Sequence, residues 1–173
     1  TGKGRSGKGQ AFRVGFMPIP FNNNSRNNFF SIMATEDNTV VNVSDYDPAV
    51  VFNGNPTMSA PSLTFVLNAG ETYTASCRFN VAANGDGLIG ALVSSDKDVV
   101  VTTGNFLGAL EPGGGGQDIG IDQIVPVDVI GNEYISIRGD GLASMEQVLV
   151  VAHENNTEVF VNGNAIAHSV LNA

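Results

Sequence analysis

Apolar and polar residues alternate in short runs along most of the chain, as they do in β-strands that bury one face. Clusters of Asn, Asp, Gly and Pro separate these runs, and no stretch resembles a long helix. The pattern predicts an all-β fold, an antiparallel, hairpin-built β-sandwich or sheet-repeat domain. Because hairpin signals do not determine how a sheet closes, propeller-like blades are the alternative.

Three hairpins are predicted from the turn signals between these runs. The first joins residues 29–36 to 39–45 through Asp37 and Asn38, whose side chains tolerate the positive φ angles of a type I′ turn. The second turns at residues 69–70. The third turns at residues 96–97, and the three valines that follow predict a central strand covered on both faces. The alternation places these side chains on the inward face: Ile32, Ala34, Val41, Val43, Leu63, Phe65, Leu67, Tyr73, Ala75, Cys77 and Phe79.

A short motif occurs twice in the chain. Residues 34–39 and the valines that follow recur as residues 152–157 with Val159 and Val161, shifted by 118 positions, and residues 67–69 recur as 171–173, shifted by 104. A strand without its partner leaves a row of unpaired backbone groups. We therefore expect a fragment of a longer repeat protein, or an edge that another chain completes through Val159, Val161, Val170 and Leu171.

These patterns divide the chain into three parts. Residues 1–11 are rich in Gly, Lys and Arg and are expected to form a flexible basic arm. Residues 12–147 are expected to form a first β-repeat unit with a Gly-rich insertion at 111–134. Residues 148–173 are expected to begin a second, truncated repeat unit.

Composition and charge narrow the possible partners. The 173 residues are 42% hydrophobic and carry a net charge of −9, with the first acid at Glu36. A body this acidic repels phosphate backbones, so no nucleic-acid partner is expected. No apolar run approaches the roughly 18–20 residues that cross a bilayer, so the chain is not expected to span a membrane. The single cysteine, Cys77, cannot form an intrachain disulfide and is expected in the core.

Four motifs occur together in one order: A-x-E-[DN]-N-T-x-V-x-V, L-N-A-G-E-x-Y, S-S-D-K-D-V-x-V-x-x-G-N and D-Q-I-V-P-V…G-N-E-Y. They resemble the N-terminal domain family named after IgGFc-binding protein, as found in large surface proteins of Bacteroidota-type bacteria, across about residues 10–173. The resemblance implies an extracellular, repeat-built β protein, secreted or at the cell surface, with no catalytic residues to carry over. Immunoglobulin binding is not carried over, because a shared fold does not transfer a ligand.

Two segments contain candidate ligand-binding residues. Asp118 and Asp122 are candidates to share one calcium ion, which prefers carboxylate and carbonyl oxygens, although turn aspartates also bond their own backbone. No cofactor is required. A sugar-binding loop, in which amides bond hydroxyls and aromatic rings stack, would use Phe21, Asn22, Asn23, Asn24, Asn27 and Asn28. The simpler interpretation of that loop is a polar segment held by buried phenylalanines.

The predicted function is non-catalytic. The chain contains two histidines and one cysteine, and it lacks a nucleophile-elbow motif. It therefore shows no sign of a catalytic triad, and no enzyme is expected. We expect an extracellular structural or adhesion module of a larger cell-surface or filament protein, acting through strand edges and sheet faces. Its partners would be neighbouring repeats of the same polypeptide or other copies of the chain. The alternative is a carbohydrate-binding module that recognises surface glycans.

Overall fold

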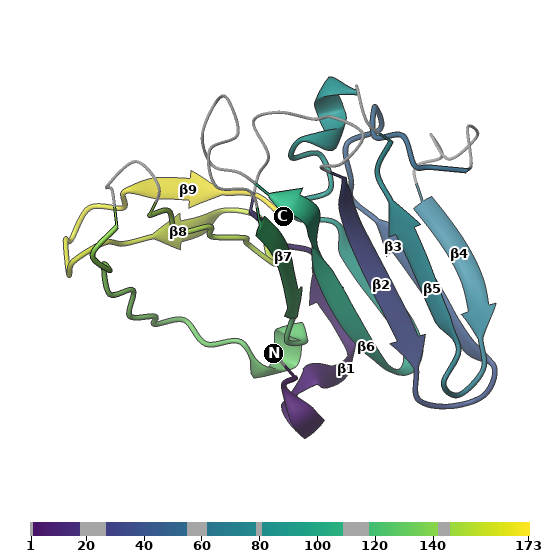
Figure 1. Ribbon diagram of the computed structural model, residues 1–173. Coiled ribbons are helices and arrows are strands. Elements are labelled where there is room, and N and C mark those ends of the chain that lie inside the picture. The colour runs from purple at the N-terminus through teal and green to yellow at the C-terminus, as the bar shows by residue number, and fades with distance from the viewer. Residues whose placement is uncertain (1, 18–26, 55–61, 79–80, 109–117, 142–145) are drawn as a thin grey trace.

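The computed structural model describes residues 2–17, 27–54, 62–78, 81–108, 118–141 and 146–173, which form an all-β protein with antiparallel strands (Figure 1). The predicted fold class is confirmed. Short 3-10 helices are η1 (Gly4–Gly7), η2 (Ala82–Asn84) and η3 (Val127–Val129). The strands are β1 (Lys8–Arg13), β2 (Asn28–Ala34), β3 (Thr39–Ser44), β4 (Ser62–Leu67), β5 (Thr72–Ser76), β6 (Leu92–Gly108), β7 (Asp118–Gln123), β8 (Thr157–Val159) and β9 (Ser169–Leu171).

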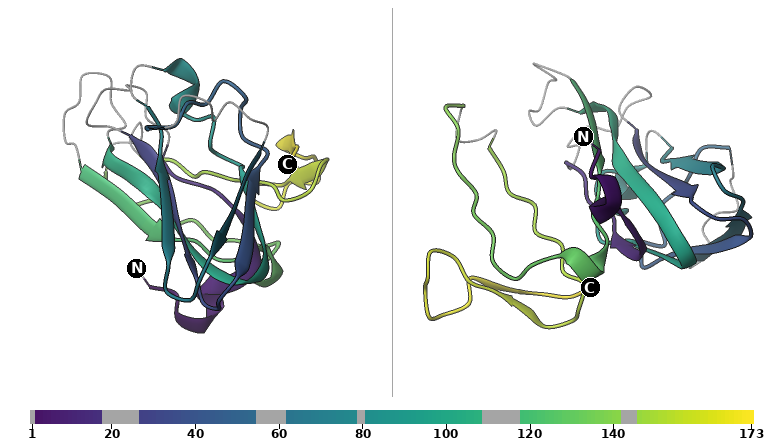
Figure 2. Two further views of the ribbon diagram at one scale, coloured as in Figure 1. Left: turned by 90° about the vertical axis from the view of Figure 1, so that its right-hand side faces the viewer. Right: turned by 90° about the horizontal axis from the view of Figure 1, so that it is seen from below.

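The long strand β6 is the centre of a seven-stranded sheet, as its run of valines predicts. Along one edge of β6, residues 92–95 pair with β3 and residues 99–105 pair with β2. Along the other edge, β1 pairs with residues 92–94 and 99–100. Strand β7 pairs with the last part of β6. Strand β4 extends the sheet beyond β3, and β5 extends it beyond β2. The sheet curls, so that the β3–β4 and β2–β5 pairs form two layers of a sandwich (Figure 2).

The predicted hairpin pairing is wrong at all three turns. Strands β2 and β3 follow one another around Asp37 and Asn38, yet β2 pairs with β5 and β6, and β3 pairs with β4 and β6. Strands β4 and β5 also lie in different layers, and β6 continues through Asp96 and Lys97 as one strand. The chain crosses between layers at the first two turns. A hairpin and such a crossover give the same alternation, because periodicity identifies the buried face of a strand and not its neighbour.

Side chains bind the turns of the sandwich to one another. The backbone N–H of Ala69 donates to Asp37 Oδ1 at 3.0 Å, and the N–H of Asn38 donates to Asn68 Oδ1 at 3.2 Å. Asn38 has a φ of 55°, which is the positive value expected at this turn. These turns are bonded to each other and to residues of β6. We name the unit they form the turn cluster; it consists of residues 35–38, 68–71 and 96–98.

Two side chains of β6, those of Asp96 and Lys97, complete the turn cluster. Asp96 Oδ1 accepts a hydrogen bond from the N–H of Val40 at 2.7 Å. Lys97 Nζ donates to the carbonyl oxygens of Asp37 and Asn38. An Asp-Lys pair in β6 thus satisfies backbone groups of the β2–β3 turn and of the start of β3.

The predicted inward face is confirmed wherever the structure describes it. Most of its side chains are buried in one core, and the others pack partly buried against that core: Ile32, Ala34, Val41, Val43, Leu67, Ala75 and Cys77 in the first group, and Leu63, Phe65 and Tyr73 in the second. Phe79 lies outside the described residues. The rings of Phe65 and Tyr73 stack across the two layers with centroids 4.1 Å apart. Burial raises the pKa of the Cys77 thiol to about 12.

The N-terminal segment differs from the flexible arm that its composition suggests. Residues 8–11 belong to β1 and pair with β6, and Gly7 and Gly9 are buried. A Cβ atom at Gly9 would lie 2.4 Å from the side chain of Pro126. These glycines permit close packing, a role that composition alone does not distinguish from flexibility.

Part of the expected insertion also lies in the sheet. Within residues 111–134, β7 pairs with β6, and Gly104 faces the backbone of Gly120 so closely that a Cβ atom there would collide with the Gly120 carbonyl oxygen. The predicted boundaries of the repeat units stay a prediction.

Candidate functional site

The candidate functional site is the C-terminal sheet, defined as β8 and β9. Thr157 lies opposite Leu171 and Val159 lies opposite Ser169. In the described part of the chain this sheet shares no ladder with the seven-stranded sheet, and it stands to one side of it in Figures 1 and 2. Each strand therefore has one edge that no described strand covers.

Side chains close the turn of the C-terminal sheet as well. Three hydrogen bonds are involved: Thr157 Oγ1 to Glu154 O (2.7 Å), Ala173 N to Asn155 Oδ1 (3.1 Å) and Asn156 N to Asn172 Oδ1 (3.1 Å). Asn156 has a φ of 59°. The turn is thus bonded to the end of β9 and not only within itself.

The same bonds occur at the corresponding positions of the β3–β4 pair. They are Thr39 Oγ1 to Glu36 O (2.7 Å), Ala69 N to Asp37 Oδ1 (3.0 Å) and Asn38 N to Asn68 Oδ1 (3.2 Å). Thr39 lies opposite Leu67, just as Thr157 lies opposite Leu171. The repeated motif therefore has the same turn bonds, the same positive φ and the same strand register in both places.

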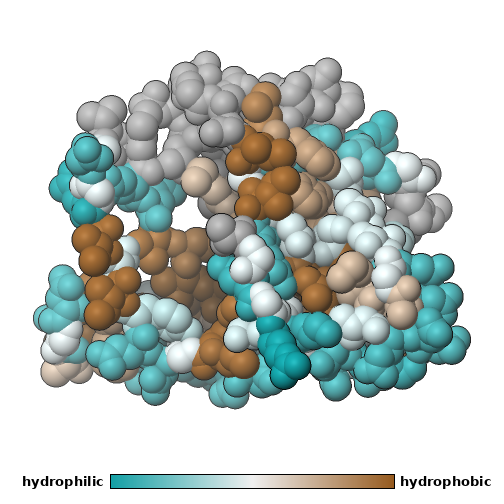
Figure 3. All heavy atoms as spheres, turned by 60° about the horizontal axis from the view of Figure 1, so that its bottom comes forward, coloured by the Kyte–Doolittle hydropathy of each residue, from teal (hydrophilic) through white to brown (hydrophobic). Residues whose placement is uncertain are grey.

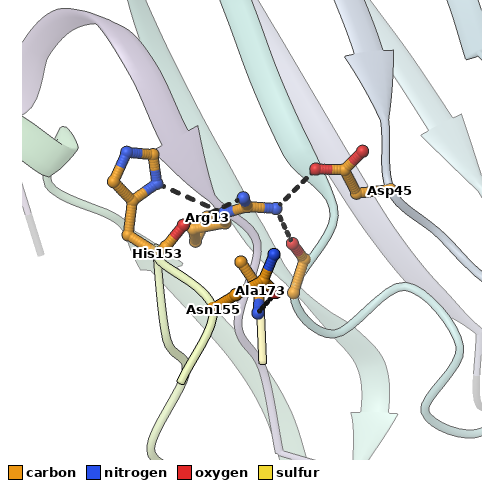
Figure 4. Close-up of polar contacts among 6 residues, drawn as sticks. Arg13, Asp45, His153, Asn155 and Ala173 are labelled. Atoms are coloured by element: carbon orange, nitrogen blue, oxygen red, sulfur yellow. Dashed lines mark hydrogen bonds and ion pairs between the residues drawn. The ribbon is translucent and has the colours of Figure 1, made fainter. Parts of the chain in front are cut away.

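Arg13 at the end of β1 connects the sandwich to the segment before β8 (Figure 4). Its Nη1 donates to Asp45 Oδ2 at 2.8 Å and to the Gly90 carbonyl oxygen at 2.9 Å. Its Nη2 donates to the His153 carbonyl oxygen at 3.2 Å, and its Nε donates to His153 Nδ1 at 3.4 Å. The Arg13 side chain is only 10% exposed, so this charge is held in place by partners from three separate segments.

The segment before β8 also packs on the sandwich through small residues. A Cβ atom at Gly15 would lie 3.7 Å from the side chains of Leu149 and Val151, and Ala152 is buried. The other side of this segment is uncovered, because Val148 is 68% exposed and Val150 is 51% exposed.

Apolar side chains gather on the side of the molecule that carries the C-terminal sheet. Figure 3 shows them around an opening beside the sandwich. The exposed apolar residues of this part of the chain include Ile135, Ile137, Val148, Leu149, Val150, Phe160, Val161, Ile166 and Val170. Exposed apolar surface of this kind typically marks a site of interaction.

The four predicted edge residues all lie in or beside the C-terminal sheet. Val161 and Val170 are exposed, whereas Val159 and Leu171 are half-buried. Their role as partner contacts stays a prediction.

The predicted calcium residues lie at the two ends of β7. The backbone of Asp118 pairs with Gly108, and Asp122 Oδ2 lies 3.3 Å from Lys3 Nζ. Burial acts to raise the pKa of Asp122, but nearby positive charge, including that of Lys3, outweighs it and holds the pKa below its usual value. No group of three or more His, Cys, Asp or Glu side chains suited to a metal occurs among the described residues. Calcium binding stays a prediction.

The predicted sugar-binding loop is described only at its end. Phe21, Asn22, Asn23 and Asn24 lie outside the described residues. Asn27 is half-buried. Asn28 is 1% exposed, and its Nδ2 donates to the carbonyl oxygens of Asn84 and Gly85. Asn28 therefore bonds the interior of the protein.

Sequence reasoning missed Arg13 and the uncovered face of residues 148–150. Arg13 carries no sequence signal for a distant partner, because its contacts come from the folded arrangement. The uncovered face of residues 148–150 did have a sequence signal. Residues 148–152 lead into the second copy of the repeated motif, just as β2 leads into the first copy at the β2–β3 turn.

A family model described as IgGFc binding protein matches residues 5–173, which include both the seven-stranded sheet and the C-terminal sheet. No curated protein and no solved structure matches the chain. Within the described residues, none of the helices is long and apolar enough to cross a membrane. The bacterial group suggested by the sequence motifs stays a prediction.

Proposed function

The chain belongs to the IgGFc-binding protein family, and on that premise we propose that it is a structural or adhesion module of a larger cell-surface or filament protein. Membership indicates an extracellular binding or structural module, and the family is non-enzymatic. The finer proposal concerns how the module acts. It joins neighbouring units through the C-terminal sheet rather than through a pocket.

The open C-terminal sheet beside uncovered apolar side chains is the observation that supports this proposal. A two-stranded sheet is marginally stable by itself and gains stability when a further strand or a packed face covers it. Val170 of β9 is 57% exposed, and Val148 and Val150 are exposed nearby in sequence to β8. Backbone groups along an open strand supply affinity, and apolar side chains on its faces supply the buried area.

Light scattering over a series of protein concentrations tests the proposal. We expect the chain to associate in a concentration-dependent way, and removal of residues 162–173 to abolish this association. Val170→Lys should weaken it, because a charge then lies on the apolar face. The matched control is Val66→Lys on β4, since Val66 is 58% exposed and occupies the corresponding register position.

Two results would contradict the proposal. One is a monomeric mass at every concentration together with dose-dependent binding on a glycan array, which would favour a carbohydrate-binding module. The other is loss of association in Val66→Lys but not in Val170→Lys, which would place the contact on the sandwich.

A further inference from the structure

The C-terminal sheet lacks one neighbour that its counterpart has. In the sandwich, β3 lies between β4 and β6, and Asn42 and Ser44 lie opposite Ser94 and Leu92 of β6. In the C-terminal sheet, β9 takes the place of β4, and no described strand takes the place of β6. The uncovered edge of β8 is therefore the edge that β6 covers in the sandwich.

The turn cluster shows which chemistry belongs at that edge. Asp96 accepts the N–H of Val40, and Lys97 donates to the carbonyl oxygens of the β2–β3 turn. The position that corresponds to Val40 is Glu158, and the turn carbonyls that correspond are those of Asn155 and Asn156. A carboxylate and an ammonium group placed as in β6 would meet a backbone donor and two backbone acceptors here.

The uncovered apolar side chains fit the same arrangement. With the shift of 118 positions, residues 148–152 correspond to residues 30–34 of β2. Phe30 and Ile32 are fully buried between β5 and β6, whereas Val148 and Val150 are exposed. The segment before β8 has the apolar pattern of β2, but in the described part of the chain no strand pairs with it as β5 and β6 pair with β2.

We propose that the open edge of β8 receives an antiparallel strand with the pattern of β6, in which an Asp-Lys pair in the middle of the strand bonds the backbone of residues 155–158. This inference rests on the proposed function, because it names the partner of that same edge. The partner is a strand of a further unit of this kind. The β6 of an intact second copy is already covered on both edges by β1, β2, β3 and β7 and cannot serve.

The test extends the full chain with a second copy of residues 70–108 after Ala173. Residues 171–173 repeat residues 67–69, so the added segment continues the pattern in register and supplies counterparts of β5 and β6. Amide hydrogen exchange is then measured at Glu158 and Phe160. We expect exchange to slow by about 100-fold relative to the parent chain, because a covered edge opens only with the structure around it. Fluorescence of a dye that binds exposed apolar surface should fall as well.

Two matched controls keep the test specific. The first carries the same added residues in scrambled order and should leave β8 exchange unchanged. The second carries Asp96→Ala and Lys97→Ala in the added copy alone, and should lose most of the protection at Glu158 while the original sandwich keeps its stability. Equal exchange at Glu158 in the parent, the extended and the scrambled chains would overturn the inference.

The outcome is separable from that of the proposed function. If the parent chain associates in light scattering but the added segment leaves β8 unprotected, the module function stands and the identity of the strand is wrong. If the added segment protects β8 in a parent chain that never associates, the strand is right and assembly between free copies is wrong.

Discussion

At the scale of single residues, the interior depends on a few well-bonded polar side chains. Asn84 is 2% exposed. Its Nδ2 donates to the carbonyl oxygens of Val51 and Arg78 at 2.8 and 2.6 Å, and its Oδ1 accepts from the N–H of Val51 at 2.9 Å. Every polar atom of this side chain is therefore bonded, as buried polar groups require.

Asn84→Ala should lower the free energy of unfolding by about 2–4 kcal/mol, because three part-buried hydrogen bonds to backbone groups of Val51 and Arg78 are lost at about 0.5–1.5 kcal/mol each. Urea denaturation measures the change. Asn53→Ala is the control, since exposed Asn53 also donates to Ser76 and Cys77. Asn53→Ala should lower the free energy of unfolding by less than about 1.5 kcal/mol. Equal losses in both variants would contradict the role assigned to Asn84.

The thiol of Cys77 gives a pH-dependent prediction. Burial raises its pKa from the usual 9.0 to about 12, so the unfolded chain releases this proton at a lower pH than the native protein does. Stability from this group is complete below pH 9 and is lost as pH rises toward 12. Between pH 8 and 10.5 the loss should be about 2 kcal/mol.

Denaturation of Cys77→Ala over the same pH range isolates this effect, because Tyr46 and Tyr73, whose pKa values burial also raises, are present in both proteins. The variant should show a shallower loss of stability. Parallel pH profiles would show that Cys77 does not contribute.

At the scale of strands and turns, the sequence predicted what each strand buries but not what it pairs with. Alternation correctly placed Ile32, Val41 and their neighbours inside. The turn residues at 37–38 and 69–70 were also correct as turns. Pairing was wrong, because β2 and β3 cross between layers and the partner of each strand comes from distant sequence. The site was partly predictable, since the repeated motif marked the C-terminal sheet, whereas the contacts of Arg13 depend on three distant segments.

The two copies of the turn allow a matched test of their separate roles. Asn68→Ala removes the acceptor of the Asn38 N–H and should lower the free energy of unfolding of the sandwich by about 0.5–1.5 kcal/mol. Asn172→Ala removes the corresponding acceptor of the Asn156 N–H. It should leave the main transition unchanged, because the C-terminal sheet shares no ladder with the sandwich among the described residues. Thermal unfolding followed by circular dichroism measures both variants, and an equal drop in Tm would contradict this separation.

At the scale of the whole molecule, a well-packed sandwich carries a second, incomplete copy of one of its own strand pairs. The sandwich has a continuous core between its two layers. The C-terminal sheet repeats the register and turn bonds of β3–β4, but no strand among the described residues covers its outer edge, and apolar side chains beside it are exposed. This arrangement is the basis for our proposal that the module binds its partner through the backbone of a strand.

Amide-resolved hydrogen exchange on the parent chain tests this account most directly, by comparing Val40 with its counterpart Glu158. The Val40 N–H is hydrogen-bonded to Asp96 of β6, so it should exchange slowly. The Glu158 N–H faces the open edge of β8 and should exchange at least about 100-fold faster. Equally slow exchange at the two amides would show that the edge of β8 is already covered, and would contradict the account.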